Sequence, residues 1–527
     1  MAASLLVKVY GAAPVGVDAV MVTIECHAMP GYDFTLVGLP DNAVKESHER
    51  ILSALMVNGL DVPRRMYTIN LAPADIRKEG AAYDLPIAIG MLAGEEQVRT
   101  QRLGDYMIMG ELSLDGTLQP IRGVLPIALC AKEQGFKGII LPEENAEEAA
   151  VVDGLEVYGL HSLPEVMMLL NGELELQPTK VDVAKMLTEQ AYDTEADFSD
   201  VRGQEQVRRA MEVAAAGGHN MIMVGPPGAG KSMMAKRLPT ILPPMTLAEA
   251  LETTKIHSVA GLMNKKAHAA KNESLICQRP FRSPHHTVTD VTLVGGGNNP
   301  HPGEISLAHN GVLFLDECVE FRRSVLEVLR QPLEDREITV ARNLMTVKYP
   351  ASFMLVAAMN PCPCGHYGEN NPAHPCTCTP GQIYRYRSRI SGPFLDRIDI
   401  QCPIEAVSYD KLRDEHPGES SASIRERVMR ARKRQEERFR EYNKTAKLPI
   451  HCNAQMSSRQ VREFCRLDAE GEKRLEMVMT KLGLSARAHD RILKVARTIA
   501  DLNGHDDIQI QDIGEAISYR EMDREVI

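Results

Sequence analysis

The stretch Gly225-Pro-Pro-Gly-Ala-Gly-Lys-Ser232 decides the fold, because it fits the phosphate-binding pattern G-x-x-x-x-G-K-[ST]. The apolar run Met221–Val224 before it predicts a buried strand, and residues 232–238 after it predict a helix. In this context the backbone N–H groups of the loop converge on phosphate oxygens, and the helix N-terminus adds partial positive charge. The residues predicted to hold the nucleotide are Gly225, Pro226, Pro227, Gly228, Ala229, Gly230, Lys231 and Ser232.

A second motif, Gly311-Val-Leu-Phe-Leu-Asp-Glu317, predicts a buried strand that ends in two acids. Lys231 of the first motif is expected to reach the β- and γ-phosphates of ATP, and the Ser232 hydroxyl to bind Mg²⁺. Asp316 is expected to hold the same Mg²⁺ through water, and Glu317 to polarise the attacking water. Such a pair of acids is the Walker B form found in ATPases that do mechanical work.

A third apolar run, residues 352–359, ends in Asn360. A polar side chain at this place can hold the attacking water, as sensor 1 does in AAA+ proteins. The catalytic residues predicted so far are therefore Glu317 and Asn360, and the predicted cofactors are ATP and Mg²⁺.

Composition sets further limits on the class of protein. The 527 residues argue for about three domains. The net charge of −11 means that any nucleic-acid contact must be local, for example inside the pore of a ring. No apolar run is long enough for a membrane span, and the N-terminus lacks the features of a signal peptide. Eleven cysteines, an odd number spread over apparent core segments, indicate a reducing cytoplasm.

Residues 1–171 predict a separate α+β domain, with two stretches, 78–88 and 110–125, that resemble the peptidase domain of Lon. Lon-like proteases use a Ser–Lys dyad, and these two positions fall on Ala82 and Leu125, which cannot act as nucleophile or base. The resemblance therefore implies the fold without the protease. A role in assembly or substrate engagement and a plain scaffold role both stay open. The predicted strands are 20–24, 35–37 and 67–71, and the predicted helices are 46–58 and 125–134.

Two projections are predicted in the nucleotide-binding part. Residues 279–304 are rich in glycine, asparagine and proline, which predicts an ordered projecting loop. Residues 336–349 predict a hairpin just before the strand that ends in Asn360. On this hairpin Arg342 and Lys348 are candidate contacts to a DNA phosphate backbone, although a solvated hairpin explains them equally well.

Four cysteines lie in a Gly/Pro/Asn/His-rich loop as two C-x-C pairs: Cys362, Cys364, Cys376 and Cys378. Four thiolates suit a tetrahedral structural Zn²⁺, which such a loop with little apolar content would need as a staple. His366 and His374 are alternative ligands, and free cytosolic thiols are the competing interpretation.

Two arginines resemble residues with which AAA+ rings bind the γ-phosphate. Arg397 matches the arginine finger that reaches the neighbouring subunit; a salt bridge to Asp396 or Asp399 in its own subunit is the alternative. Arg487 resembles sensor 2 and is expected to contact the γ-phosphate of its own subunit; a cap or surface arginine is the alternative. The basic helix predicted at 424–447 is expected to be a solvated surface, and contact with DNA or with a neighbouring subunit is the alternative.

Residues 309–317, 330–335 and 358–365 together resemble the magnesium-chelatase-like AAA+ ATPases, and within them the YifB/ComM family, over the whole chain. The resemblance implies an α/β P-loop AAA+ ATPase module with a helical lid, preceded by an α+β Lon-protease-like (ribosomal S5 domain 2-like) domain. The implied domains are 1–171 (Lon-like, without the dyad), 172–198 (linker), 199–404 (ATPase core with helix-2 insert, pre-sensor hairpin and Cys-rich loop) and 405–527 (lid, like the magnesium-chelatase C-terminal domain).

The same resemblance implies a cytoplasmic homohexamer that acts as a helicase on single-stranded or branched DNA and promotes branch migration during natural transformation. Two alternatives stay open. One is a protein-remodelling AAA+ ATPase, and the other is the ATPase subunit of a magnesium-chelatase-like metal-insertion complex. The chelatase subunit lacks a Lon-like domain and a Cys-rich loop, which weighs against the second alternative.

Overall fold

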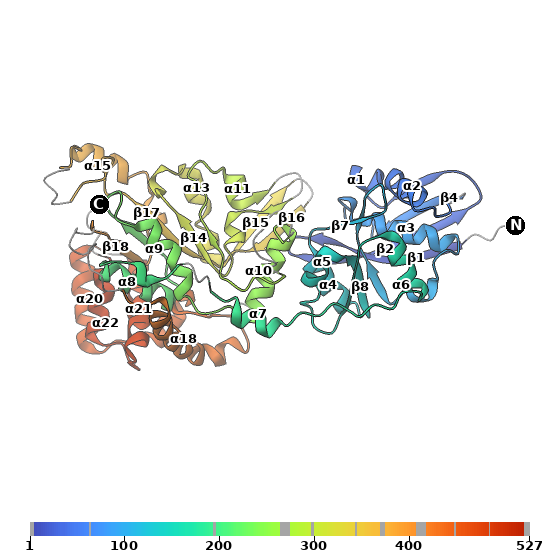
Figure 1. The fold of residues 1–527 in the computed structure, drawn as a ribbon. Coiled ribbons are helices and arrows are strands. Elements are labelled where there is room, and N and C mark those ends of the chain that lie inside the picture. Colours follow the sequence, from blue (N-terminus) through green and yellow to red (C-terminus); the bar gives the residue numbers. More distant parts are fainter. Residues whose placement is uncertain are drawn as a thin grey trace.

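The computed structural model describes residues 5–62, 65–192, 196–263, 274–296, 300–342, 345–368, 375–406, 418–446, 449–483 and 485–520. A sheet with helices at the N-terminal end of the chain forms one body, and a second sheet packs with the C-terminal helices into another (Figure 1). None of the described helices combines the length and the apolar composition that a membrane crossing needs.

The N-terminal part is built on a seven-stranded mixed sheet in the order β3-β4-β2-β1-β5-β8-β9. The strands, which include the three predicted ones, are β1 Leu5–Val15, β2 Asp18–Met29, β3 Phe34–Val37, β4 Met66–Ala72, β5 Tyr106–Ile108, β8 Gly138–Pro142 and β9 Glu156–Leu160, with a small separate pair β6 Glu111–Leu112 and β7 Leu118–Gln119. The helices are α1 Asn42–Lys45, α2 Ser47–Val57, α3 Asp84–Gly94, α4 Val124–Glu133, α5 Glu143–Ala149 and α6 Leu163–Asn171. Helices α2 and α4 confirm the two helices predicted here.

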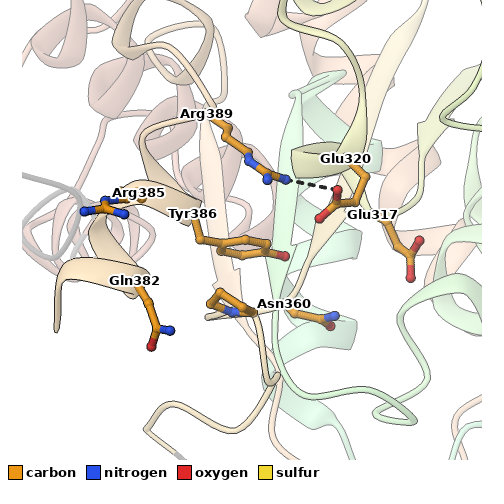
Figure 2. A pocket seen from close by; sticks show the side chains of 8 residues that line it. Glu317, Glu320, Asn360, Gln382, Arg385, Tyr386 and Arg389 are labelled. Carbon is orange, nitrogen blue, oxygen red and sulfur yellow. Dashed lines mark hydrogen bonds and ion pairs between the residues drawn. The ribbon is translucent and has the colours of Figure 1, made fainter. Parts of the chain in front are cut away.

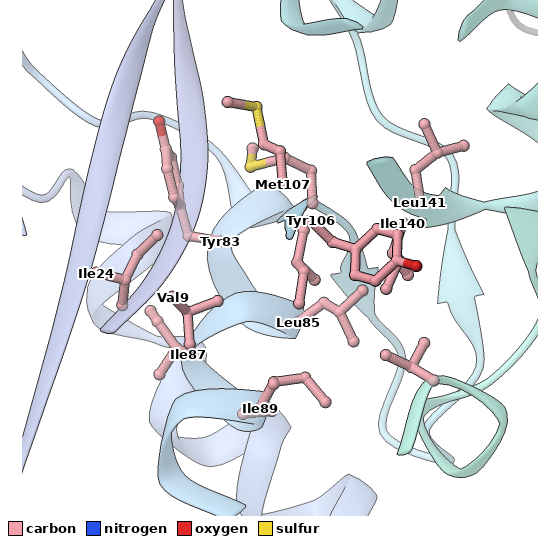
Figure 3. Close-up of a cluster of buried hydrophobic side chains, with 14 of the residues drawn as sticks. Val9, Ile24, Tyr83, Leu85, Ile87, Ile89, Tyr106, Met107, Ile140 and Leu141 are labelled. Carbon is pink, nitrogen blue, oxygen red and sulfur yellow. The ribbon is translucent and has the colours of Figure 1, made fainter. Parts of the chain in front are cut away.

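Helix α3 fills the core of this part. All of its residues are buried, and Ile87 and Ile89 join Val9 of β1 in one apolar cluster (Figure 3). Gly90 faces Cys26 of β2 so closely that a Cβ atom would overlap the sulfur. A glycine is therefore needed for the helix to approach the sheet.

A cavity of about 580 Å³ lies beside Ala82, the position that the resemblance to Lon aligns with the dyad serine. Ala82 lines it, and Leu125 is fully buried at the start of α4. The next part of the chain contributes one wall, through Pro300, His301 and Val347. No nucleophile or base stands at the two dyad positions.

A buried carboxylate joins the N-terminal part to the following one. Glu148 of α5 accepts hydrogen bonds from the Leu125 backbone N–H (3.0 Å) and from the Ser258 hydroxyl (2.5 Å) of helix α10, Leu247–Val259. Lys255 of the same helix pairs with Asp18 at 2.9 Å. Burial raises the pKa of Glu148 to about 7, although both hydrogen bonds lower it.

Glu148→Gln is expected to make stability less dependent on pH. The pKa in the folded protein lies above the ordinary value of 4.5, so the folded state binds the proton more tightly. The stabilisation is therefore complete below about pH 4.5 and is lost as the pH rises to about 7, at a cost of about 3 kcal/mol. Thermal unfolding midpoints between pH 5 and 8 should fall more steeply for the wild type than for Glu148→Gln. The exposed Glu133→Gln on α4 is the matched control, and equal slopes for all three proteins would contradict the prediction.

A five-stranded parallel sheet, β11-β14-β17-β10-β18, forms the centre of the second part. Its strands are β11 Phe281–Arg282, β14 Val312–Leu315, β17 Met354–Met359, β10 Met221–Val224 and β18 Ile400–Pro403. Every residue of β10, β14 and β17 is buried, as expected when both faces of a parallel sheet are covered. The helices, with the linker helix α7, are α7 Val183–Glu189, α8 Glu205–Gly217, α9 Lys231–Arg237, α10 Leu247–Val259, α11 Asp290–Val294, α12 Glu304–Leu307, α13 Arg323–Val328, α14 Pro332–Asp335, α15 Pro380–Arg387 and α16 Gly392–Leu395.

This part also contains two hairpins, the second of which packs into a hydrophobic cluster through Ile338, Val340 and Val347. One is β12 Gly295–Gly296 with β13 His301–Pro302, and the other is β15 Glu337–Arg342 with β16 Met345–Pro350. The second confirms the hairpin predicted before Asn360. Short 3-10 helices along the whole chain lie at Ala81–Tyr83, Thr100–Arg102, Phe198–Asp200, Leu238–Ile241, Cys318–Glu320 and Asn453–Gln455.

The C-terminal part is helical, with α18 Ser421–Asn443, α19 Ser458–Phe464, α20 Ala469–Leu482, α21 Ala486–Asn503 and α22 Ile510–Ser518. Figure 1 shows these helices on the side of the core away from the N-terminal part. Three arginines of α18 do not form the solvated surface that the sequence predicts. Arg427 pairs with Glu419 and Glu212, Arg438 with Asp501, and Arg432 donates to a backbone carbonyl of α8. Packing against α8 and α21 explains the difference.

Candidate nucleotide-binding site

The three predicted motifs meet at one edge of the central sheet. The P-loop follows β10, Asp316 follows β14 and Asn360 follows β17, and these strands are parallel neighbours. Because the carboxyl ends of parallel strands lie at the same edge, the sheet brings the motifs together. Gly228 and Gly230 have φ angles of 78° and 88°, which favour glycine, so the loop needs both.

Lys231 is the centre of the loop. Its ammonium group donates to the carbonyls of Gly225 (2.7 Å) and Pro226 (2.8 Å) and to Asn360 Oδ1 (3.0 Å). Burial lowers its pKa, whereas the carboxylates of Asp316 and Glu317 raise it. A buried cation is thus fixed between the loop and the end of β17, where it can meet phosphate oxygens.

The residues present fit a magnesium ion. The Ser232 hydroxyl donates to Asp316 Oδ2 at 2.6 Å. A hydroxyl and a carboxylate are hard oxygen ligands of the kind that Mg²⁺ takes together with water and phosphate. These two side chains would hold the ion, which supplies charge compensation for the phosphates.

Glu317 follows the end of β14 by two residues and is exposed. Its backbone is left-handed (φ 49°), which is uncommon outside glycine, and its side chain is 59% exposed. The His286 Nδ1 atom lies 3.8 Å from the Glu317 carboxylate. The Glu317 carboxylate is therefore available to a water molecule, and His286 of the loop 279–304 lies beside it.

A pocket of about 440 Å³ opens next to Glu317 and Asn360 (Figure 2). Helix α15 and the residues after it form the opposite wall, with Tyr386 and Arg389. Burial raises the pKa of the Tyr386 hydroxyl to about 12, although the nearby backbone of Asn360 lowers it. Arg389 pairs with Glu320 at 3.0 Å. Sequence reasoning missed this wall and His286, because no motif marks them.

Arg397 lies at the opposite edge of the sheet. Its carbonyl accepts from Asn220 at 3.1 Å, and Asn220 precedes β10, whereas the P-loop follows it. A strand of four residues spans about 13 Å. Arg397 as a residue is 7% exposed, and its guanidinium is held by Pro393 O (2.6 Å) and Glu334 (2.6 Å). The Arg397 backbone therefore lies at the edge of the sheet away from the P-loop of its own chain, and its guanidinium is bonded to other groups of that chain.

The partner of Arg397 differs from the alternative considered from the sequence. Glu334, and not Asp396 or Asp399, forms the intrachain pair. Asp399 is instead bonded to His219 (3.1 Å) and Arg491 (3.0 Å). Burial alone would raise the pKa of Asp399, but these two partners hold it far below its ordinary value.

The packing of α21 favours another position for Arg487 than the expected contact with the γ-phosphate of its own subunit, which stays a prediction. Arg491, one turn further along α21, reaches Asp399 at the amino edge of the sheet. From there α21 runs to Asn503, which meets Arg209 of α8. The N-terminal end of α21, with the exposed Arg487, is thus at the edge away from the P-loop. Tertiary packing of the helical part, which the local sequence does not encode, decides this position.

The four loop cysteines come together. Their sulfur atoms lie within 4.8 Å of one another, with Cys362 at 3.3 Å from Cys364 and 3.8 Å from Cys376. Among the described residues, His366 does not belong to this group, and His374 lies outside the described residues.

The two candidate DNA contacts are only partly described. Lys348 is exposed and pairs with Glu337 across the hairpin at 2.6 Å. The side chain of Arg342 lies outside the part whose side chains the structure describes. The predicted contacts to DNA stay predictions.

Comparison with known proteins identifies the family. Residues 197–412 match the magnesium chelatase ChlI-subunit family, residues 24–145 a second ChlI-subunit family, and residues 418–520 the ChlI C-terminal family. The YifB protein of Escherichia coli K12 is 44% identical over 522 residues, and Competence protein ComM of Haemophilus influenzae is 43% identical over 522 residues. Each alignment covers 98% of both chains. The chain belongs to the YifB/ComM family of magnesium-chelatase-like proteins.

Membership of the YifB/ComM family implies an AAA+ ATPase, with ATP and Mg²⁺ as its cofactors. Lon protease 2 of Bacillus subtilis is a more distant relative, 28% identical over 144 residues, which are 27% of this chain and 26% of that protein. The family assignment and the Lon resemblance, both predicted from the sequence, are thus supported by independent comparisons.

Proposed function

We propose that this YifB/ComM-family ATPase is a DNA motor, a hexameric helicase that promotes branch migration in recombination. The main support for the proposal is that the predicted ATPase residues of one chain stand at both edges of the central sheet. Lys231 and Asp316 stand at the carboxyl edge, and Arg397 stands at the amino edge. A single chain therefore holds two halves of different sites, which is the arrangement that a ring of identical subunits requires.

In the proposed reaction, Lys231 binds the β- and γ-phosphates, and Ser232 and Asp316 hold Mg²⁺. Asn360, bonded to Lys231, orients the water that attacks the γ-phosphate. Glu317, exposed beside it, polarises this water and receives its proton. Bound Mg²⁺ supplies compensation for the phosphate charge.

Arg397 completes this site in the neighbouring subunit. One strand length separates it from the P-loop of its own chain, so a phosphate contact must be made across an interface. Arg487 lies at the same edge, and we place it against the same neighbouring nucleotide. Hydrolysis would then depend on the oligomer.

The remaining assignments complete the proposal. Residues 1–171 form a Lon-like domain without protease activity, 172–198 a linker, 199–404 the ATPase core and 405–527 a helical lid that moves with the nucleotide state. The cysteine cluster binds a structural Zn²⁺, because four thiols lie within reach of one ion. The protein works in the cytoplasm. DNA is the partner because a relative is a competence protein, and competence is the uptake of DNA.

ATP-dependent branch migration on a labelled three-strand or four-way junction tests the proposal. The wild type is expected to move the junction, whereas Glu317→Gln is expected to bind ATP without moving it. DNA should also raise the rate of ATP hydrolysis by the wild type. If the wild type hydrolyses ATP at a rate that DNA does not change and moves no junction, the motor assignment is wrong. Protein remodelling or metal insertion would then take its place.

A further inference from the structure

The cysteine cluster links the nucleotide site to one wall of the pocket beside it. Cys362 follows Asn360 by two residues, and Cys378 precedes α15 by two residues. A metal ion at the cluster would therefore tie the end of β17 to the start of α15. Thr379 and Gln382 form a capping box at this helix start, so α15 begins at a fixed point.

The sulfur positions fit a tetrahedral metal. With Zn–S bonds of about 2.3 Å, the edges of a ZnS₄ tetrahedron are about 3.8 Å long. The sulfur of Cys362 lies 3.3 Å from that of Cys364 and 3.8 Å from that of Cys376, and Cys364 and Cys376 are 3.5 Å apart. All eleven cysteines are free thiols. Such a set of soft ligands selects zinc or iron rather than magnesium.

Further contacts hold the cysteine loop against the P-loop on one side and against α15 on the other. Gly365, with φ 88°, packs against the P-loop so closely that a Cβ atom would lie 2.7 Å from Pro227 Cδ. On the other side, Arg387 of α15 donates to the Pro361 carbonyl at 3.0 Å and lies 5.2 Å above the Tyr367 ring. The cluster therefore stands between the P-loop and α15.

Helix α15 and the turn after it supply the pocket wall that faces Glu317. Tyr386 and Asn360 both line the pocket, and Arg389 reaches Glu320 across it (Figure 2). Asn360 in turn contacts Lys231. A shift of α15 would thus move the groups around the attacking water.

We propose that Zn²⁺ in the cysteine cluster clamps α15 against the pocket beside Glu317, so that ATP hydrolysis, but not ATP binding, requires the metal. The inference rests on the proposed ATPase function and on zinc as the metal. Binding is expected to survive without zinc because β10 and α9, which flank the P-loop and include Lys231 and Ser232, are anchored in the hydrophobic core. Within the described residues, the cysteine loop touches this unit only through the contact of Gly365 with Pro227 described above. Tyr386 and Arg389 act here as positioning residues.

The double variant Cys376→Ser/Cys378→Ser tests the clamp, and Cys130→Ser, a cysteine of α4 outside the cluster, is the matched control. Metal analysis should find one zinc per chain in the wild type and the control, and none in the double variant. Affinity for a fluorescent ATP analogue should stay within about threefold, while kcat falls by about 10- to 100-fold.

Tyr386→Phe and Arg389→Ala test the wall without touching the metal. Both variants should keep zinc and ATP binding, and both should lower kcat. The clamp is wrong if the zinc-free variant hydrolyses ATP at the wild-type rate, or if it loses ATP binding together with hydrolysis. Iron, no metal, or a disulfide at the cluster in the purified wild type would overturn the zinc site. Metal content and ATPase activity are measured separately, so the two proposals can fail separately. A wild type that contains zinc but has no ATPase activity would refute the proposed function.

Discussion

Arg397→Ala is expected to lower kcat for ATP hydrolysis by about a thousandfold and to leave ATP affinity nearly unchanged. An arginine that acts on the transition state from another subunit contributes little to ground-state binding. Arg397 is buried at the amino edge of the sheet, with its guanidinium on Glu334 and the Pro393 carbonyl. It therefore cannot reach the phosphates of its own chain, and its loss should spare the P-loop.

Mixed oligomers provide the decisive measurement. Arg397→Ala subunits keep an intact P-loop, and Lys231→Ala subunits keep an intact Arg397, so some interfaces in a mixture carry a complete site. The mixture is expected to hydrolyse ATP faster than either variant alone. Arg459→Ala, an exposed arginine of α19, is the control and should match the wild type. A mixture no more active than its components would contradict a role in trans, and wild-type activity of Arg397→Ala would remove Arg397 from the site.

The residues of the P-loop edge could be predicted from the sequence because each one directly follows a short apolar strand. Val224, Leu315 and Met359 end three buried strands, and the parallel sheet then brings together whatever follows them. Ser232 and Asp316, which follow two of these strands, hydrogen-bond directly to each other. Local pattern and sheet geometry together were sufficient for this half of the site.

The opposite edge depends on how the C-terminal helices pack, which the local sequence does not encode. The sequence around Arg487 does not indicate which edge of the sheet α21 packs against. The contact of Arg491 with Asp399 brings this end of α21 to the amino edge. The pocket wall is a similar case. Tyr386 and Arg389 follow a cysteine-rich loop, and only the folded loop brings them to Asn360. Long-range packing, rather than residue type, gives these side chains their place.

Lys231→Ala is expected to weaken ATP binding by about 10- to 100-fold, the loss of charged hydrogen bonds worth 1.5–3 kcal/mol. Hydrolysis should fall by about a further 100-fold, because the same cation stabilises charge on the γ-phosphate in the transition state. In the folded chain this ammonium group bonds two loop carbonyls and Asn360, so its removal also frees the side chain that orients the attacking water.

Lys236→Ala is the matched control, since Lys236 is an exposed lysine of the same helix α9. It should bind and hydrolyse ATP as the wild type does, and both variants should be compared by titration with a fluorescent ATP analogue and by phosphate release. The thermal unfolding midpoint of Lys231→Ala separates loss of the site from loss of the fold. An unchanged midpoint with lost ATP binding supports the assignment. Equal ATP affinity and kcat in the two variants would mean that phosphate binds elsewhere, and the site built around β10, β14 and β17 would then have to be abandoned.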